Sequence, residues 1–95
     1  MRDYELMTIH RPEFAESEIQ GKVGELEAAL SSAGCSVTGS DLWGKRRFAY
    51  EIDHITEGYY TVVNFQGEAD AVHTVDRMLT LSDEIVRHKI VGKNN

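Results

Sequence analysis

Two kinds of hydrophobic period alternate along this chain, and their order leaves few folds open. Two segments, Phe14–Ala33 and Glu68–Leu81, repeat apolar residues at every third or fourth position, as amphipathic helices do. Four other segments carry the alternating, β-branched or aromatic residues of β-strands: Arg2–His10, Ser36–Ile52, Gly58–Phe65 and Glu84–Val91. The chain is therefore expected to run strand, helix, strand, strand, helix, strand.

This order predicts an α+β, ferredoxin-like split βαβ fold (βαββαβ). Right-handed crossovers then place both helices on one face of a four-stranded antiparallel sheet. A chain of 95 residues can bury one core but not two, so residues 1–95 are expected to form a single domain, with residues 92–95 frayed. The core between the helices and the sheet is expected to contain Leu26, Leu30, Val63, Phe65, Val75 and Leu79.

The second face of this sheet is expected to stay open. Successive side chains of a strand point to opposite faces, so apolar residues occur on both faces of the first and third strands. An exposed apolar surface with neighbouring cations is typical of a binding surface, although a face-to-face dimer of the same chain would produce the same pattern. The residues expected on the open face include Met7, Ile9, Tyr60, Val62, Arg87 and Lys89.

A Trp-Gly corner followed by three cations, Lys45, Arg46 and Arg47, interrupts the second strand. Glycine tolerates φ > 0, so Gly44 is expected to break the strand pairing and re-aim its neighbours. Cations beside aromatic rings are suited to binding a polyanion such as RNA, because the cations can pair with phosphates and the rings can stack on unpaired bases. The alternative is an edge strand whose charges prevent aggregation between sheets.

Composition limits the partners of this chain. The formal net charge of −6 argues against a freestanding nucleic-acid binder, so any RNA contact must be local or shared with a basic partner. The lone Cys35 cannot form an intramolecular disulfide, and it is expected to be a small packed residue rather than a nucleophile. The four histidines are scattered, so no metal site is expected, and no signal peptide or membrane span is recognised. The sequence is typical of a reduced, cytosolic protein.

Four motifs together resemble one known family. The opening Arg2–Glu5 looks like an Arg-x-Tyr-Glu start, and Trp43–Ile52 (WGKRRFAYEI) is similar to a Trp/Leu-Gly-x-Arg-x-Leu-Ala-Tyr-Pro-Ile core. Gly58–Tyr60 resembles an aromatic third-strand start, and Ser82–Arg87 resembles an Asn/Asp-x-Val-x-Arg ending. These motifs belong to the bacterial small-subunit ribosomal protein S6 family, and the resemblance covers essentially the whole chain.

The resemblance implies a structural ribosomal protein and not an enzyme. Members of that family bind central-domain 16S ribosomal RNA together with ribosomal protein S18, a basic companion that would explain how an acidic chain sits on RNA. We therefore expect a monomer when isolated, a cytoplasmic, ribosomal location, and no cofactor or metal. The candidate RNA-binding residues are Arg2, Lys45, Arg46, Arg47, Arg87 and Lys89. The candidate partner-binding residues are Met7, Ile9, Trp43, Tyr60 and Val62.

Two departures from the family pattern limit what can be carried over. Glu51 stands where the core motif has Pro, and the sequence ends at Asn95 without the longer tail of some members. Two other classes of function stay open on the residues alone. One is a self-associating ferredoxin-like module, such as a dimeric ligand-sensing or exchange-factor domain. The other is a small dimeric enzyme with half an active site on the open face, for which no nucleophile–base pair is recognisable.

Overall fold

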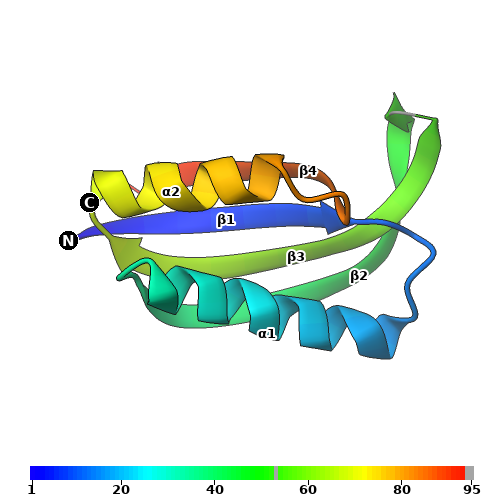
Figure 1. The fold of residues 1–95 in the computed structure, drawn as a ribbon. Coiled ribbons are helices and arrows are strands. Elements are labelled where there is room, and N and C mark those ends of the chain that lie inside the picture. The colour runs from blue at the N-terminus through cyan, green and yellow to red at the C-terminus, as the bar shows by residue number, and fades with distance from the viewer. Residues whose placement is uncertain (53, 94–95) are drawn as a thin grey trace.

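A computed structural model describes residues 1–52 and 54–93 of the chain. It forms one four-stranded sheet with the strand order β2-β3-β1-β4, in which every neighbouring pair is antiparallel. Both helices lie on the same face of that sheet (Figure 1). The predicted α+β, ferredoxin-like fold is confirmed. Its elements are β1 (Arg2–His10), α1 (Glu16–Ser32), β2 (Ser36–Ile52), β3 (Ile55–Gly67), α2 (Ala69–Thr80) and β4 (Ile85–Lys93).

Two strands are longer than the sequence predicts. β3 starts at Ile55 rather than Gly58, because Ile52 pairs with Ile55 and shortens the connection that was expected over residues 53–58. Asp53, within that connection, lies outside the described residues. β4 continues through Gly92 and Lys93, which pair with the start of β1 instead of fraying, since this pairing satisfies backbone groups that β1 would otherwise leave open. Asn94 and Asn95 also lie outside the described residues.

The core lies between the two helices and one face of the sheet. All six residues predicted for it are buried, and Leu30 and Val63 have no exposed surface. Leu6 of β1 joins them, and the ring of Tyr4 stacks on that of Phe65 with centroids 5.5 Å apart. The predicted side-chain alternation of β1 and β3 is thus confirmed, because even residues of β1 and odd residues of β3 face the helices.

The end of α1 is fixed by a left-handed glycine. Gly34 has φ of 92°, as expected for a helix-ending glycine. Its N–H donates to the carbonyl of Ser31 at 3.0 Å, and the N–H of Cys35 donates to that of Leu30 at 2.9 Å. This pair of bonds satisfies the last helical carbonyls and turns the chain into β2, so that Cys35 becomes part of the core.

A small polar cluster is buried at one end of this core. The hydroxyl groups of Thr8 and Thr61 are hydrogen-bonded to each other, and Nε2 of His10 lies 3.0 Å from the Thr8 oxygen and 3.3 Å from the Thr61 oxygen. Burial lowers the pKa of His10 from 6.5 to about 4, although the nearby Glu84 carboxylate opposes this shift. The imidazole is therefore neutral at pH 7.

Truncation of Leu30 tests the packing of α1 on the sheet. Leu30→Ala should lower the free energy of unfolding by about 2–5 kcal/mol, because it leaves a cavity in the core. Leu81→Ala is the matched control, since the Leu81 side chain is 77% exposed, and should cost less than about 1 kcal/mol. Denaturant melts of the two variants measure the difference. Equal losses would contradict the burial of α1.

Acidification should destabilise the fold through His10. The unfolded imidazole takes up a proton near pH 6.5, whereas the buried one does so near pH 4. Neutral His10 therefore does not reduce stability above the unfolded pKa of 6.5. As the pH falls from there towards 4, the free energy of unfolding decreases by roughly 3 kcal/mol in total, because the unfolded chain binds the proton first. Melts of the wild type and His10→Gln at about pH 7 and about pH 5 should show the stability of the wild type falling more steeply. Parallel pH profiles would argue against a neutral buried His10.

Candidate protein and nucleic-acid interface

The face of the sheet away from the helices consists of four rows of side chains, set by the register of the strands. Each row takes one residue from β4, β1, β3 and β2, in that order. The rows are Arg87-Ile9-Tyr60-Gly44, Lys89-Met7-Val62-Asp41, Val91-Glu5-Asn64-Gly39 and Lys93-Asp3-Gln66-Ser36. Apolar residues and cations gather in the first two rows, and polar residues dominate the last two.

The polar half of this face is bonded within itself. Nζ of Lys93 donates to the amide oxygen of Asn64 at 2.6 Å and lies 3.9 Å from a carboxylate oxygen of Glu5. The amide nitrogen of Gln66 donates to Asp3 at 2.8 Å. Since these groups already have partners, this half offers a ligand little that is unsatisfied.

The apolar half is partly covered by the chain itself. Ile9 and Val62, both predicted to bind a partner, are only 7% and 4% exposed. A Cβ placed on Gly58 would lie 2.8 Å from a methyl group of Ile9 and 3.2 Å from the Phe48 ring, so both side chains pack over this glycine. The Phe48 ring also meets Tyr60 edge-on, with centroids 6.1 Å apart. Ile9 and Val62 therefore form the floor of the surface, and a partner would not contact them over any large area.

The remaining partner-binding candidates are accessible. Met7 and Tyr60 are partly exposed, and the Trp43 side chain is 46% exposed. These three residues come from different strands, yet they belong to the same half of the open face or its border. We define the apolar patch as Met7, Tyr60 and Trp43 over the floor of Ile9 and Val62.

The predicted corner at Gly44 is confirmed as an irregularity in the β2–β3 pairing. Leu42 pairs with Thr61 and Gly44 pairs with Tyr60, which leaves Trp43 as the extra residue of a bulge. Gly44 has φ of 87°, a conformation that strongly favours glycine. Beyond this point, residues 45–52 and 55–58 continue as a hairpin arm that extends past the end of β1 and curves away from the sheet (Figure 1).

The three consecutive cations do not form one patch, because they alternate across the hairpin arm. Lys45 pairs with Tyr59 and places its ammonium 5.3 Å from the centre of that ring, on the side of the helices. Arg46 falls on the side of the open face, where its guanidinium lies 5.5 Å from the centre of the Trp43 ring. Arg47 alternates back to the side of Lys45.

The other predicted cations are also divided. Arg87 and Lys89 lie on β4 in the first two rows, so they edge the apolar patch opposite the hairpin arm, across three strand spacings or about 14 Å. Arg2 pairs with Gly67 at the far end of β1 and is not brought together with the others. All six cations are exposed, and none forms an ion pair with another residue in the described part of the chain.

Other kinds of site find little support in the described residues. They contain no group of three or more His, Cys, Asp or Glu side chains that could hold a metal ion. Burial raises the pKa of the Cys35 thiol, which fits the predicted packing role rather than a nucleophile. None of the helices in residues 1–52 and 54–93 is long and apolar enough to cross a membrane.

Comparison with known proteins identifies the family to which a chain with this fold and sequence belongs. The sequence profile of the family described as "Ribosomal protein S6" matches residues 3–92. The chain belongs to the ribosomal protein S6 family. Relatives named small ribosomal subunit protein bS6 include one from Carboxydothermus hydrogenoformans, 41% identical over 99% of this chain and 98% of the relative. Another, from Symbiobacterium thermophilum, is 42% identical over 96% of each chain.

A solved structure supports the same assignment. The crystal structure of 30S ribosomal protein S6 from Thermotoga maritima superposes with a TM-score of 0.90 at 27% identity, covering 97% of this chain and 87% of that one. The S6 proteins are structural components of the small ribosomal subunit and not enzymes, so the small-enzyme hypothesis is excluded. The comparisons do not assign individual residues to RNA or to a protein partner, so those assignments stay predictions.

Sequence reasoning missed two features of this S6-family interface: the separation of Arg46 from Lys45 and Arg47, and the burial of Ile9. The bulge at Gly44 could have revealed both. A bulge adds a residue to β2, and side-chain alternation restarts from Gly44. Counting by two from Gly44 places Arg46 and Phe48 on the open face and separates Arg46 from its two neighbours. The burial of Ile9 under Phe48 then follows from the pairing of Arg46 with Gly58, since the glycine leaves room for both side chains.

Truncation of Ile9 and Met7 tests the division between floor and accessible surface. Ile9→Ala should lower the free energy of unfolding by about 2–5 kcal/mol, because it leaves a cavity under Phe48. Met7→Ala, on the same face but partly exposed, should cost less than half as much. Urea melts of both variants measure this difference. A larger loss for Met7→Ala would contradict the arrangement.

Proposed function

We propose that this S6-family chain binds central-domain 16S ribosomal RNA together with ribosomal protein S18, as part of the cytoplasmic ribosome. The observation that carries this proposal is the apolar patch edged by cations that have no ion-pair partner in the described residues. An apolar surface of this kind fits a protein partner, and unpaired cations at its rim fit phosphates.

Net charge supports a requirement for two partners. At −6 the isolated chain repels RNA at long range, and a few local cations do not reverse that repulsion. A basic protein seated on the apolar patch would supply the missing positive charge next to Arg46, Arg87 and Lys89. Each macromolecule would then raise the affinity of the chain for the other.

The two sides of the proposed interface use different residues. The protein partner would cover Met7, Tyr60 and Trp43, whose exposed apolar surface water solvates poorly. RNA phosphates would meet Arg46 on the hairpin arm and the cations of β4 at the opposite edge. Lys45 and Arg47, on the other side of the arm, could contact the same RNA only where it passes around the arm. Arg2, at the far end of β1, would need a separate segment of RNA.

A self-associating module remains the alternative, because a second copy of the chain could also cover the apolar patch. Size-exclusion chromatography of the purified chain separates the two: the proposed function expects a monomer, and a stable dimer held through Met7 and Tyr60 would favour self-association. Co-purification of the tagged chain with small ribosomal subunits tests the ribosomal role directly.

Removal of two arm cations tests the RNA contact. Each phosphate contact contributes about 0.7–0.9 to the slope of log K against log salt concentration. Replacing Arg46 and Arg47 by Gln should therefore weaken the complex of this chain, ribosomal protein S18 and RNA, and should flatten that slope by about one to two. Filter binding at several salt concentrations measures both quantities.

The matched control for this experiment is Arg77→Gln, because Arg77 is exposed near the end of α2, on the helix side of the molecule. It should change neither the affinity nor the slope. If the doubly substituted chain behaves like the control, the arm cations only protect an edge strand from aggregation.

A further inference from the structure

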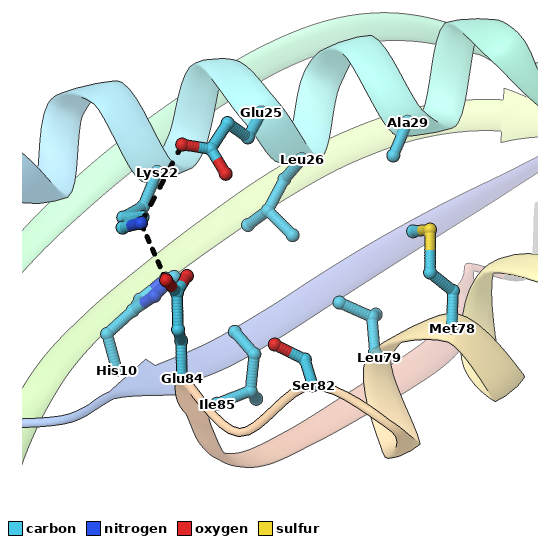
Figure 2. A pocket seen from close by; sticks show the side chains of 10 residues that line it. All are labelled: His10, Lys22, Glu25, Leu26, Ala29, Met78, Leu79, Ser82, Glu84 and Ile85. Atoms are coloured by element: carbon cyan, nitrogen blue, oxygen red, sulfur yellow. Dashed lines mark hydrogen bonds and ion pairs between the residues drawn. The ribbon is translucent and has the colours of Figure 1, made fainter.

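A cavity of about 190 Å³ lies between α1, α2 and the start of β4, on the side of the sheet away from the proposed interface (Figure 2). One end is polar, with His10, Lys22, Glu25, Ser82 and Glu84. The rest is apolar and is formed by Leu26, Ala29, Met78, Leu79 and Ile85. The proposed ribosomal contacts use none of these residues.

The charges at the polar end already have partners. Nζ of Lys22 lies 2.8 Å from a carboxylate oxygen of Glu84 and 3.7 Å from one of Glu25, as the dashed lines in Figure 2 show. The hydrogen bond to Glu84 is the main reason why the pKa of Lys22 is raised. Because two carboxylates face the one ammonium, the polar end repels an anion, and a cation would have to compete with Lys22 for those carboxylates. The cavity therefore favours a neutral ligand.

His10, which lines the polar end of this cavity, carries an unsatisfied ring nitrogen. Its side chain is buried with 1% exposed, and Nε2 is engaged by Thr8 and Thr61. Nδ1 is the buried side-chain nitrogen for which the described residues provide no hydrogen-bond partner. Buried polar atoms in proteins nearly always have a partner, so this nitrogen points to a ligand that completes it.

The chemistry of the missing partner follows from the imidazole. A neutral imidazole presents either an N–H or a lone pair at Nδ1, and a hydroxyl group can both donate and accept, so it satisfies either tautomer. The whole cavity, at about 190 Å³, is larger than an engineered cavity of about 150 Å³ that holds benzene, so it has room for one aromatic ring. We propose that this cavity binds a phenol, with the ring between Leu26 and Leu79 and the hydroxyl group hydrogen-bonded to Nδ1 of His10.

Entry of the hydroxyl group requires a small rearrangement. Nδ1 is covered by protein atoms, and Glu84 lies beside His10 at the polar end of the cavity (Figure 2). The Glu84 side chain is 45% exposed, so its carboxylate has room to turn towards water. The phenol could be a free small molecule or the tyrosine side chain of a partner protein, because both present the same ring and hydroxyl group.

Titration of the isotope-labelled full chain with p-cresol, followed by NMR, tests the proposal. We expect saturable shifts of the His10 ring signals and of the methyl signals of Leu79 and Ile85. Ala29→Leu fills the cavity and should weaken binding at least about tenfold. Ala28→Leu is the matched control, because Ala28 is exposed on the same helix and does not line the cavity; it should leave the affinity unchanged.

A second probe tests the hydrogen bond without changing the protein. p-Xylene has a methyl group in place of the hydroxyl group of p-cresol, so it should bind about tenfold more weakly. Equal or tighter binding of p-xylene, equal binding to Ala29→Leu, or the absence of saturable shifts would each overturn the proposal. N-acetyltyrosinamide separates the sources: binding comparable to that of p-cresol assigns the site to a tyrosine side chain, and exclusion while p-cresol binds assigns it to a free phenol.

Discussion

The two-residue period of the central strands is the constraint on which the rest of this structure depends. β1 and β3 each send one set of side chains to the helices and the other set to the open face, so Leu6 and Val63 are core while Met7 and Val62 are not. A shift of one residue in either strand would exchange these sets and expose the core. The same alternation therefore fixes both the packing that stabilises the fold and the surface available to partners.

The sequence was sufficient to predict the elements, their order and the core, because each depends on a local period. The irregularity at Gly44 was also predictable, since glycine adopts positive φ more readily than any other residue. Strand alternation alone separates Arg46 from Lys45 and Arg47, and the prediction of one cation cluster overlooked it; which of the three faces the open side depends on the register between β2 and β3. The burial of Ile9 was missed for the same reason, as it requires Phe48 from a distant part of the chain to pack over Gly58.

Charge is distributed unevenly between the two sides of the sheet. α1 carries Glu16, Glu18, Glu25 and Glu27 on the helix side, while Arg87, Lys89 and Arg46 border the apolar patch on the other. An acidic back and a locally basic front orient a chain with respect to a polyanion, even when its net charge is unfavourable. The distribution thus matters more than the total of −6 for how an S6-family protein meets RNA.

The hairpin arm has a consequence for the dynamics of the molecule. β1 ends at His10, so residues beyond Lys45 and Tyr59 pair only within the β2–β3 hairpin and gain no support from a third strand. Such a two-stranded ribbon opens with a smaller free energy than the four-stranded sheet, and its amide protons exchange through that local opening. We therefore expect the arm to open as a separate cooperative unit. Its opening leaves the core intact but dismantles the Phe48 cover over Ile9, so the shape of the apolar patch follows the state of the arm.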